Sequence, residues 1–312
     1  MRYIIKKVLM MALTLMVVSL CVFLSFNIIP GDPATRRLGT EATPELIQQV
    51  REEMGLNEPL LVRYKDWVVS MVKGDMGTSY SYALPVSSMI ADKIPITVTM
   101  ALMAFALMVI ISIPLGLYTA KHAGGVIDRV IVVLNQIVMA IPPFFSGILL
   151  SLVFGMILKL FTPGAFVSYK TDMKGFIHYL IFPAIAIALP KASMCIKLLR
   201  SSVIEEASKD YTRTAYSRGN STNGVLYKHV LKNAMIPVIT FMGMALADMI
   251  AGSIVIEQVF GIPGLSRILM TSISNRDYPV VEAIIMMIAA IVIVTNLLVD
   301  IIYRIVDPRI EE

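Results

Sequence analysis

The chain has 312 residues, of which 57% are hydrophobic and 16% are charged, and its net charge is +5 at pH 7. A soluble domain carries about 25% charged residues, so this composition excludes an ordinary soluble protein. The uncharged runs predict an all-α polytopic membrane protein, and the positive charge fits cytoplasmic loops, since no basic-aromatic cluster indicates nucleic acid binding.

The first transmembrane helix is predicted over residues 1–29. An uncharged run from residue 8 to residue 26 follows Arg2, Lys6 and Lys7. The run is too long for a signal peptide and lacks a cleavage site after it, so we expect an uncleaved span with its N-terminus in the cytoplasm.

Residues 30–93 are polar and predict a small extracytoplasmic subdomain. Thr43 can cap a helix with Pro44 at its first position, and Gly55 is a suitable stop. A second short helix is expected from about Leu60 to Val72.

The remaining core, residues 94–304, is expected to hold five more spans and a cytoplasmic tail over 305–312. Pro142 and Pro143 should kink the third span of the chain, and Pro183 and Pro190 should interrupt the fourth. The short segments rich in Lys and Arg place both termini in the cytoplasm. The five spans lie at about 94–120, 130–158, 176–197, 234–256 and 280–303.

Between the fourth and fifth of the six spans lies a basic polar segment, residues 201–233, which we call the elbow. Its first helix should end at Gly219, because glycine takes the left-handed conformation that closes a helix. Ser221 or Thr222 can cap the next helix. The elbow is either an ordinary solvated loop or a surface held by another protein.

Catalytic and metal-binding motifs are absent from the sequence. There is no P-loop and no H-E-x-x-H, the three histidines are scattered, and the two cysteines lie in apolar runs. We therefore expect no enzyme activity, no metal site and no cofactor on this chain.

Asp248 is a charged residue inside the fifth span. Such residues tend to face a cavity or a polar partner, because a lone charge in lipid is costly. Asp248 either lines a translocation path or forms a pair. Asn135 and Gln136, in the third span, either line the same path or hydrogen-bond between helices, and Lys191 snorkels or pairs near the end of the fourth span.

Several motifs follow one another along the chain. They read PGDPA at 30–34, REEMGLNEPLLVRYKDWV at 51–68, GDMGTSY at 74–80, DYTRTAYSRG at 210–219, EQVFGIPGL at 257–265, RDYP at 276–279 and DPR at 307–309. In this order they resemble permeases of type I ABC importers, in the dipeptide, oligopeptide and nickel branch, first (B-type) subunit. The elbow resembles the coupling loop of these permeases, although Arg213 stands where the wider superfamily has glutamate.

The resemblance implies a subunit that forms half of a translocation path for peptides in a prokaryotic cytoplasmic membrane. It implies a homologous second permease, two P-loop ATPases that carry ATP and Mg²⁺, and an extracytoplasmic binding protein. The implied ATPase contacts in the elbow are Asp210, Tyr211, Arg213, Thr214, Ala215, Arg218 and Gly219. The implied docking residues for the binding protein are Asp32, Trp67, Asp75, Glu257 and Asp277, of which the last two could instead cap helices.

Three alternatives stay open at this point. The same family includes permeases for nickel and glutathione. An ion-coupled secondary transporter could use Asp248 as its proton site, but it would not explain the elbow. A membrane scaffold without transport activity is the third, and the intramembrane polar residues argue against it.

Overall fold

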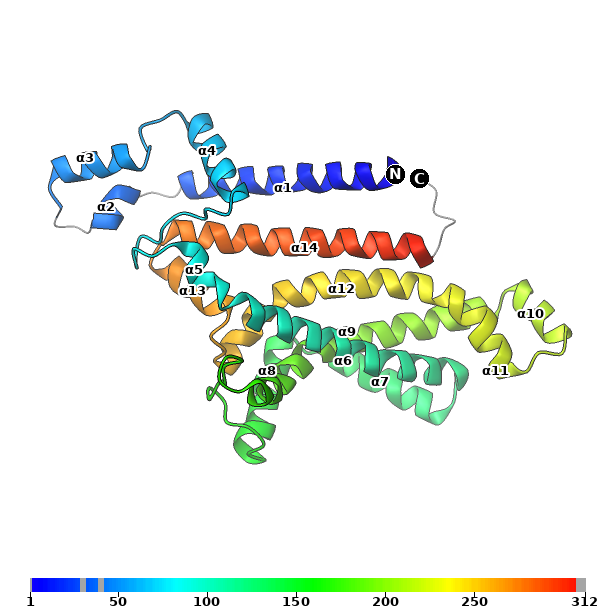
Figure 1. Cartoon of the computed structure of the whole chain (residues 1–312). Helices are drawn as coiled ribbons and strands as arrows, with labels where there is room; N and C mark the ends of the chain where they lie inside the picture. Colours follow the sequence, from blue (N-terminus) through cyan, green and yellow to red (C-terminus); the bar gives the residue numbers. More distant parts are fainter. Residues whose placement is uncertain (1, 29–31, 39–41, 307–312) are drawn as a thin grey trace. The chain divides into compact units, whose positions relative to one another are not determined.

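A computed structural model of the chain describes residues 2–28, 32–38 and 42–306 (Figure 1). Regular structure in these residues is helical apart from one isolated bridge between Thr78 and Pro85, which confirms the all-α prediction. The predicted tail, from residue 307 onward, lies outside the described residues. The α-helices are α1 (Arg2–Ile28), α2 (Pro33–Leu38), α3 (Pro44–Glu53), α4 (Leu60–Val72), α5 (Val86–Ala91), α6 (Ile94–Lys121), α7 (Val126–Ala140), α8 (Pro143–Leu150), α9 (Met173–Ala207), α10 (Asp210–Ser217), α11 (Thr222–Val225), α12 (Leu231–Phe260), α13 (Leu265–Ser274) and α14 (Tyr278–Val306).

Five helical stretches of the described chain are long and apolar enough to cross a membrane. They are Ile5–Ile28, Val86–Lys121, Met173–Ala207, Thr222–Phe260 and Tyr278–Val299. A sixth candidate is the pair α7 and α8, the latter continued by a π-helical segment to Ile157, with a bend of 102° between the two. Pro142 and Pro143 lie at this bend, where the sequence predicts a kink.

The fourth span differs from its prediction. Pro183 and Pro190 lie inside α9, yet the helix runs without interruption for 35 residues. A proline in a transmembrane helix frees one carbonyl that neighbouring helices or local adjustments can satisfy. The helix also continues past the predicted end of the span at residue 197, so the first residues of the expected elbow belong to α9.

The chain divides into two compact units, which we describe separately. Unit 1 consists of residues 1–96 and 263–293. Within it α1 packs on α4: Ser19 and Tyr64 share a hydrogen bond of 2.8 Å, and the ring of Phe23 lies 5.4 Å from that of Tyr64 and 5.8 Å from that of Trp67. Thr43 caps α3, as predicted, by accepting from the Leu46 amide.

Unit 2 consists of residues 97–262 and 294–312. In it α9 packs along α12, α7 and α8. Close approaches depend on small residues, because a Cβ on Gly116 would lie 2.8 Å from the Leu199 side chain. The two long helices α9 and α12 are joined by α10 and α11 at one end, as Figure 1 shows.

Candidate functional site

At the centre of the elbow, the short helix α10 lies between the ends of the long helices α9 and α12. The first long helix, α9, ends at Ala207, and α10 begins at Asp210 after a turn. Gly219 follows α10 with φ +82°, which confirms the predicted left-handed glycine. Ser221 then caps α11 by accepting from the Gly224 amide at 3.2 Å.

Hydrogen bonds fix α10 to both neighbouring helices. The Thr212 hydroxyl donates to the Glu206 carbonyl at 3.0 Å, and the Tyr211 hydroxyl donates to the Glu206 carboxylate at 2.7 Å. Asn233, in the first turn of α12, donates to the Tyr211 oxygen at 3.2 Å. Lys209 also pairs with Glu206 at 2.5 Å. These bonds therefore hold α10 firmly against the ends of α9 and α12.

These contacts shift the ionisation of two elbow residues. Partial burial, together with the hydrogen bond to the Glu206 carboxylate, raises the pKa of Tyr211. The same carboxylate raises the pKa of Lys209 by accepting its hydrogen bond. Tyr211 therefore remains a neutral donor, and Lys209 a cation, at any physiological pH.

The outer face of α10 carries most of the predicted ATPase contacts. Arg213 and Asp210 lie 3.6 Å apart and are 78% and 96% exposed. An ion pair this exposed contributes little to stability and leaves both groups available. The other exposed members of the predicted set are Tyr211, Thr214, Arg218 and Gly219.

Ala215 differs from the rest of that set. It is buried within the chain, as is Thr212, so it forms part of the inner face of α10. Its carbonyl accepts a hydrogen bond of 2.9 Å from Asn220, which closes the turn after the helix. The structure thus gives Ala215 a packing role inside the elbow and places it off the exposed face.

The intramembrane charge Asp248 has a partner in the same unit. Lys191 of α9 donates to its carboxylate at 2.7 Å across the α9–α12 interface. Asp248 remains 64% exposed and Lys191 26% exposed. Of the two roles left open by the sequence, the structure therefore shows pairing, and lining of a path stays a prediction.

Asn135 and Gln136 border a small cavity of about 170 Å³ between α7 and α9. Arg200 also lines it and binds Asp128 of α7 through two hydrogen bonds of 2.7 and 2.8 Å. Asp128 is 2% exposed and also accepts from the Gly124 amide. No local sequence pattern indicates this pair, because its members lie 72 positions apart.

Two of the five predicted docking residues are buried. Asp277 accepts from the Ser79 hydroxyl and from the Tyr80 amide at 2.9 Å, and Glu257 accepts from the Thr97 hydroxyl. Both carboxylates are 0% exposed. They tie segments of the chain together and offer no surface for direct docking.

The other three predicted docking residues belong to unit 1. Asp32 pairs with Arg51 at 3.1 Å, and Asp75 accepts from the Gly77 amide at 2.9 Å. Trp67 contacts Phe23 and lines a cavity together with Asp75. Nothing in the structure tests their contact with another protein, and it stays a prediction.

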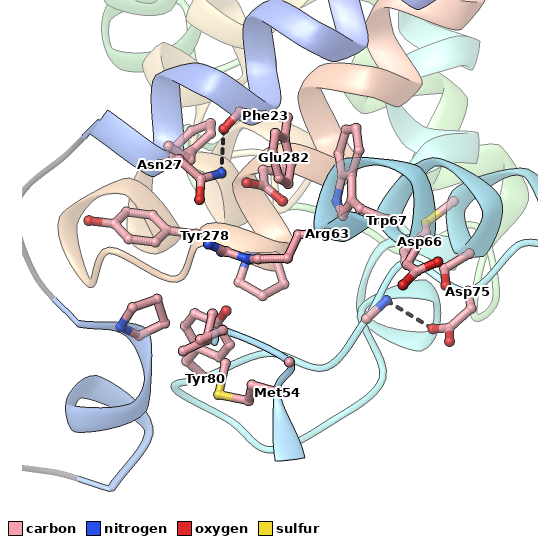
Figure 2. Close-up of a pocket in the computed structure, with 18 of the residues that line it drawn as sticks. Phe23, Asn27, Met54, Arg63, Asp66, Trp67, Asp75, Tyr80, Tyr278 and Glu282 are labelled. Atoms are coloured by element: carbon pink, nitrogen blue, oxygen red, sulfur yellow. Dashed lines mark hydrogen bonds between the residues drawn. The ribbon is translucent and has the colours of Figure 1, made fainter. Parts of the chain in front are cut away.

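This outer cavity has a volume of about 350 Å³ and lies wholly within unit 1. Side chains from α1, α4 and α14 surround it, as Figure 2 shows with Asn27, Arg63, Trp67, Tyr278 and Glu282. Sequence reasoning missed Arg63 and Glu282, although Glu282 is a charge inside the sixth span, which is the signal that singled out Asp248.

The described residues contain no group of three His, Cys, Asp or Glu side chains that could hold a metal ion.

Comparison with known proteins identifies the family. Residues 112–312 match the model of the binding-protein-dependent transport system inner membrane component, and residues 1–101 match the N-terminal model of such membrane components. The chain belongs to this family of ABC transporter permeases. The match confirms the resemblance seen in the sequence motifs, and it argues against a secondary transporter or a scaffold.

Relatives of this permease cover its whole length. It is 38% identical to the oligopeptide transport system permease protein AppB of Bacillus subtilis, over 99% of both chains. It is 31% identical to the probable peptide ABC transporter permease protein y4tP of Sinorhizobium fredii, over 99% of this chain and 98% of the relative. It is 36% identical to the glutathione transport system permease protein GsiC of Salmonella choleraesuis, again over 99% and 98%. The chain is therefore a multi-pass membrane permease of the peptide importer family, a class of transport subunits.

Proposed function

We propose that this permease forms half of the translocation path of an ATP-driven peptide importer and couples to cytoplasmic ATPases through its elbow. A homologous second permease supplies the other half, and a binding protein delivers the solute from outside the cytoplasmic membrane of a prokaryote. ATP and Mg²⁺ bind on the two ATPase subunits.

The observation that carries this proposal is the construction of the elbow. A helix fixed on one face to the ends of α9 and α12, with an exposed polar face opposite, can transmit a rigid push to both spans. If α10 were loosely attached, motion of a bound partner would bend the connecting turns and would not move α9 and α12.

Charge reversal in the elbow tests the coupling. Arg213→Glu with Arg218→Glu changes the exposed face and leaves the anchoring bonds of Tyr211 and Thr212 intact. In proteoliposomes that hold the complete importer, we expect at least a tenfold loss of ATP-driven uptake and of co-purifying ATPase. The matched control is Lys121→Glu, an exposed cation at the end of α6, which should leave both unchanged.

Uptake that survives the double reversal while the control behaves normally would reject coupling through α10. Loss of uptake with full retention of the ATPases would show that the elbow transmits motion without supplying the binding energy.

Peptides are the favoured solute because two of the relatives carry that description. Glutathione, itself a peptide, is the second candidate, since GsiC is described as a glutathione permease. Uptake of a labelled dipeptide, in competition with oligopeptides, glutathione and a nickel chelate, separates these solutes once the cognate binding protein is present.

A further inference from the structure

The outer cavity of unit 1 combines aromatic walls with an excess of negative charge. Phe23, Phe26, Trp67, Tyr80 and Tyr278 contribute rings to it. Among the described residues that line it, Arg63 alone is basic, whereas Glu58, Asp66, Asp75 and Glu282 are acidic. A cavity with this lining attracts a cation and repels an anion.

Glu282 is the buried charge of the cavity. It lies in the second turn of α14 and is 9% exposed, whereas Asp66 and Asp75 lie at the exposed rim. The Trp67 side chain hydrogen-bonds to it, and the Arg63 guanidinium lies close enough to stabilise its negative charge electrostatically. Burying a carboxylate is costly without a counter-charge or a full set of donors. Arg63 is partly exposed to solvent, so a ligand that brings a second positive charge into the cavity would offset more of this cost.

We propose that this cavity is a binding site for a primary ammonium group, with Glu282 as its counter-charge. Phe23 and Trp67 both line the cavity, and the centroids of their rings lie 5.8 Å apart. Aromatic faces attract cations, most strongly where water is excluded. The volume of about 350 Å³ lies at the lower end of the range for ligand pockets, so it suits the end of a short peptide or one lysine side chain.

The same chemistry can come from two sources, the amino terminus of a solute or a lysine side chain of a protein partner. Both bring a primary ammonium on a short apolar stem, and the experiment below separates them. The inference does not depend on the elbow, because the cavity and α10 belong to different units.

The chain carries its own reporter for this site. Trp67 is the single tryptophan among the 312 residues, and it lines the cavity. Its fluorescence in the purified full-length chain, in detergent, therefore reports on occupancy without a label.

Three probes decide the chemistry. Ala-Ala amide offers an amino terminus, N-acetyl-Ala-Ala amide lacks the ammonium group, and Nα-acetyl-lysine amide offers the side-chain ammonium only. We expect a saturable change in Trp67 emission with at least one of the two ammonium probes. The acetylated dipeptide should bind at least tenfold more weakly than Ala-Ala amide, if Ala-Ala amide is the probe that binds.

The pattern of response identifies the source. A response to Ala-Ala amide alone assigns the site to a solute amino terminus, and a response to Nα-acetyl-lysine amide alone assigns it to a protein lysine. A response to both shows that the cavity recognises the ammonium group itself. No response to either, or an equal response to the acetylated dipeptide, overturns the proposal.

A variant tests the role of Glu282. Glu282→Gln should weaken ammonium binding at least tenfold, and Glu282→Asp should weaken it less, because the charge is retained but drawn back. The matched control is Glu53→Gln on α3, an exposed position of the same unit. Unchanged affinity in Glu282→Gln overturns the proposal. If that variant fails to fold, as judged by circular dichroism, the three probes on the unsubstituted chain decide the question.

Discussion

Asp277 should stabilise unit 1 more than any exposed carboxylate of the chain. Its side chain is 0% exposed and accepts three hydrogen bonds, from the Ser79 hydroxyl and from the amides of Tyr80 and Ser81. Hydrogen bonds to a charged group contribute about 1.5–3 kcal/mol each, and an unmet buried donor costs about 1–3 kcal/mol. Water can reach the two amides in part, so we expect Asp277→Ala to cost about 3–5 kcal/mol.

Denaturant unfolding of the detergent-purified chain, followed by the fluorescence of Trp67, measures this cost within the same unit. Asp66→Asn, an exposed carboxylate of α4, is the matched control and should change the free energy of unfolding by less than about 0.5 kcal/mol. In a double-mutant cycle, Ser79→Ala should cost clearly less once Asp277 is absent, because its partner is already gone. A loss below about 1 kcal/mol for Asp277→Ala would refute the assignment of this carboxylate as a structural tie.

Three further predictions concern unit 2. Arg200→Gln leaves Asp128 buried without its counter-charge and should cost about 3–5 kcal/mol, measured by thermal or denaturant unfolding, whereas the double neutralisation with Asp128→Asn should recover most of it. Gly219→Ala should loosen the elbow by about 1–2 kcal/mol, seen as faster amide exchange in α10, because its φ of +82° disfavours a Cβ. Lys191→Met should lower stability or uptake, because it removes the partner of Asp248. The double variant Lys191→Asp with Asp248→Lys should restore at least half of that loss. Equal losses in the single and the double variant would contradict the pairing.

Local signals in the sequence predicted the local structure well. The bounds of α4 match the expected helix from Leu60 to Val72, and Thr43 caps α3 as expected. Gly55 and Gly219 both have positive φ where the sequence calls for a helix stop. Caps and stops of this kind are set by a few neighbouring residues, so they can be derived without knowledge of the fold.

Expectations that depended on neighbouring helices were less reliable. The prolines of α9 were expected to interrupt the span, but packing on α7, α8 and α12 holds the helix continuous. The family resemblance implied Ala215 as an ATPase contact, and that contact stays a prediction. Within this chain Ala215 is buried on the inner face of α10, which depends on how that helix packs.

The positions of buried charges could not be predicted from the sequence, because each depends on a partner far along the chain. Two of the motifs that resemble the permease family, GDMGTSY at 74–80 and RDYP at 276–279, supply the two halves of one contact between Ser79 and Asp277, 198 residues apart. Neither half indicates hydrogen bonding when read alone, and Asp277 was interpreted as a docking or helix-capping residue because it lies near the outer face. The contact of Glu257 was equally hidden in the sequence, because its partner Thr97 lies 160 residues away at the start of α6. A motif shared with a transport family can therefore reflect a hydrogen bond inside the chain instead of a partner contact. The surface that binds partners is better sought among exposed charges such as Arg213 and Arg218.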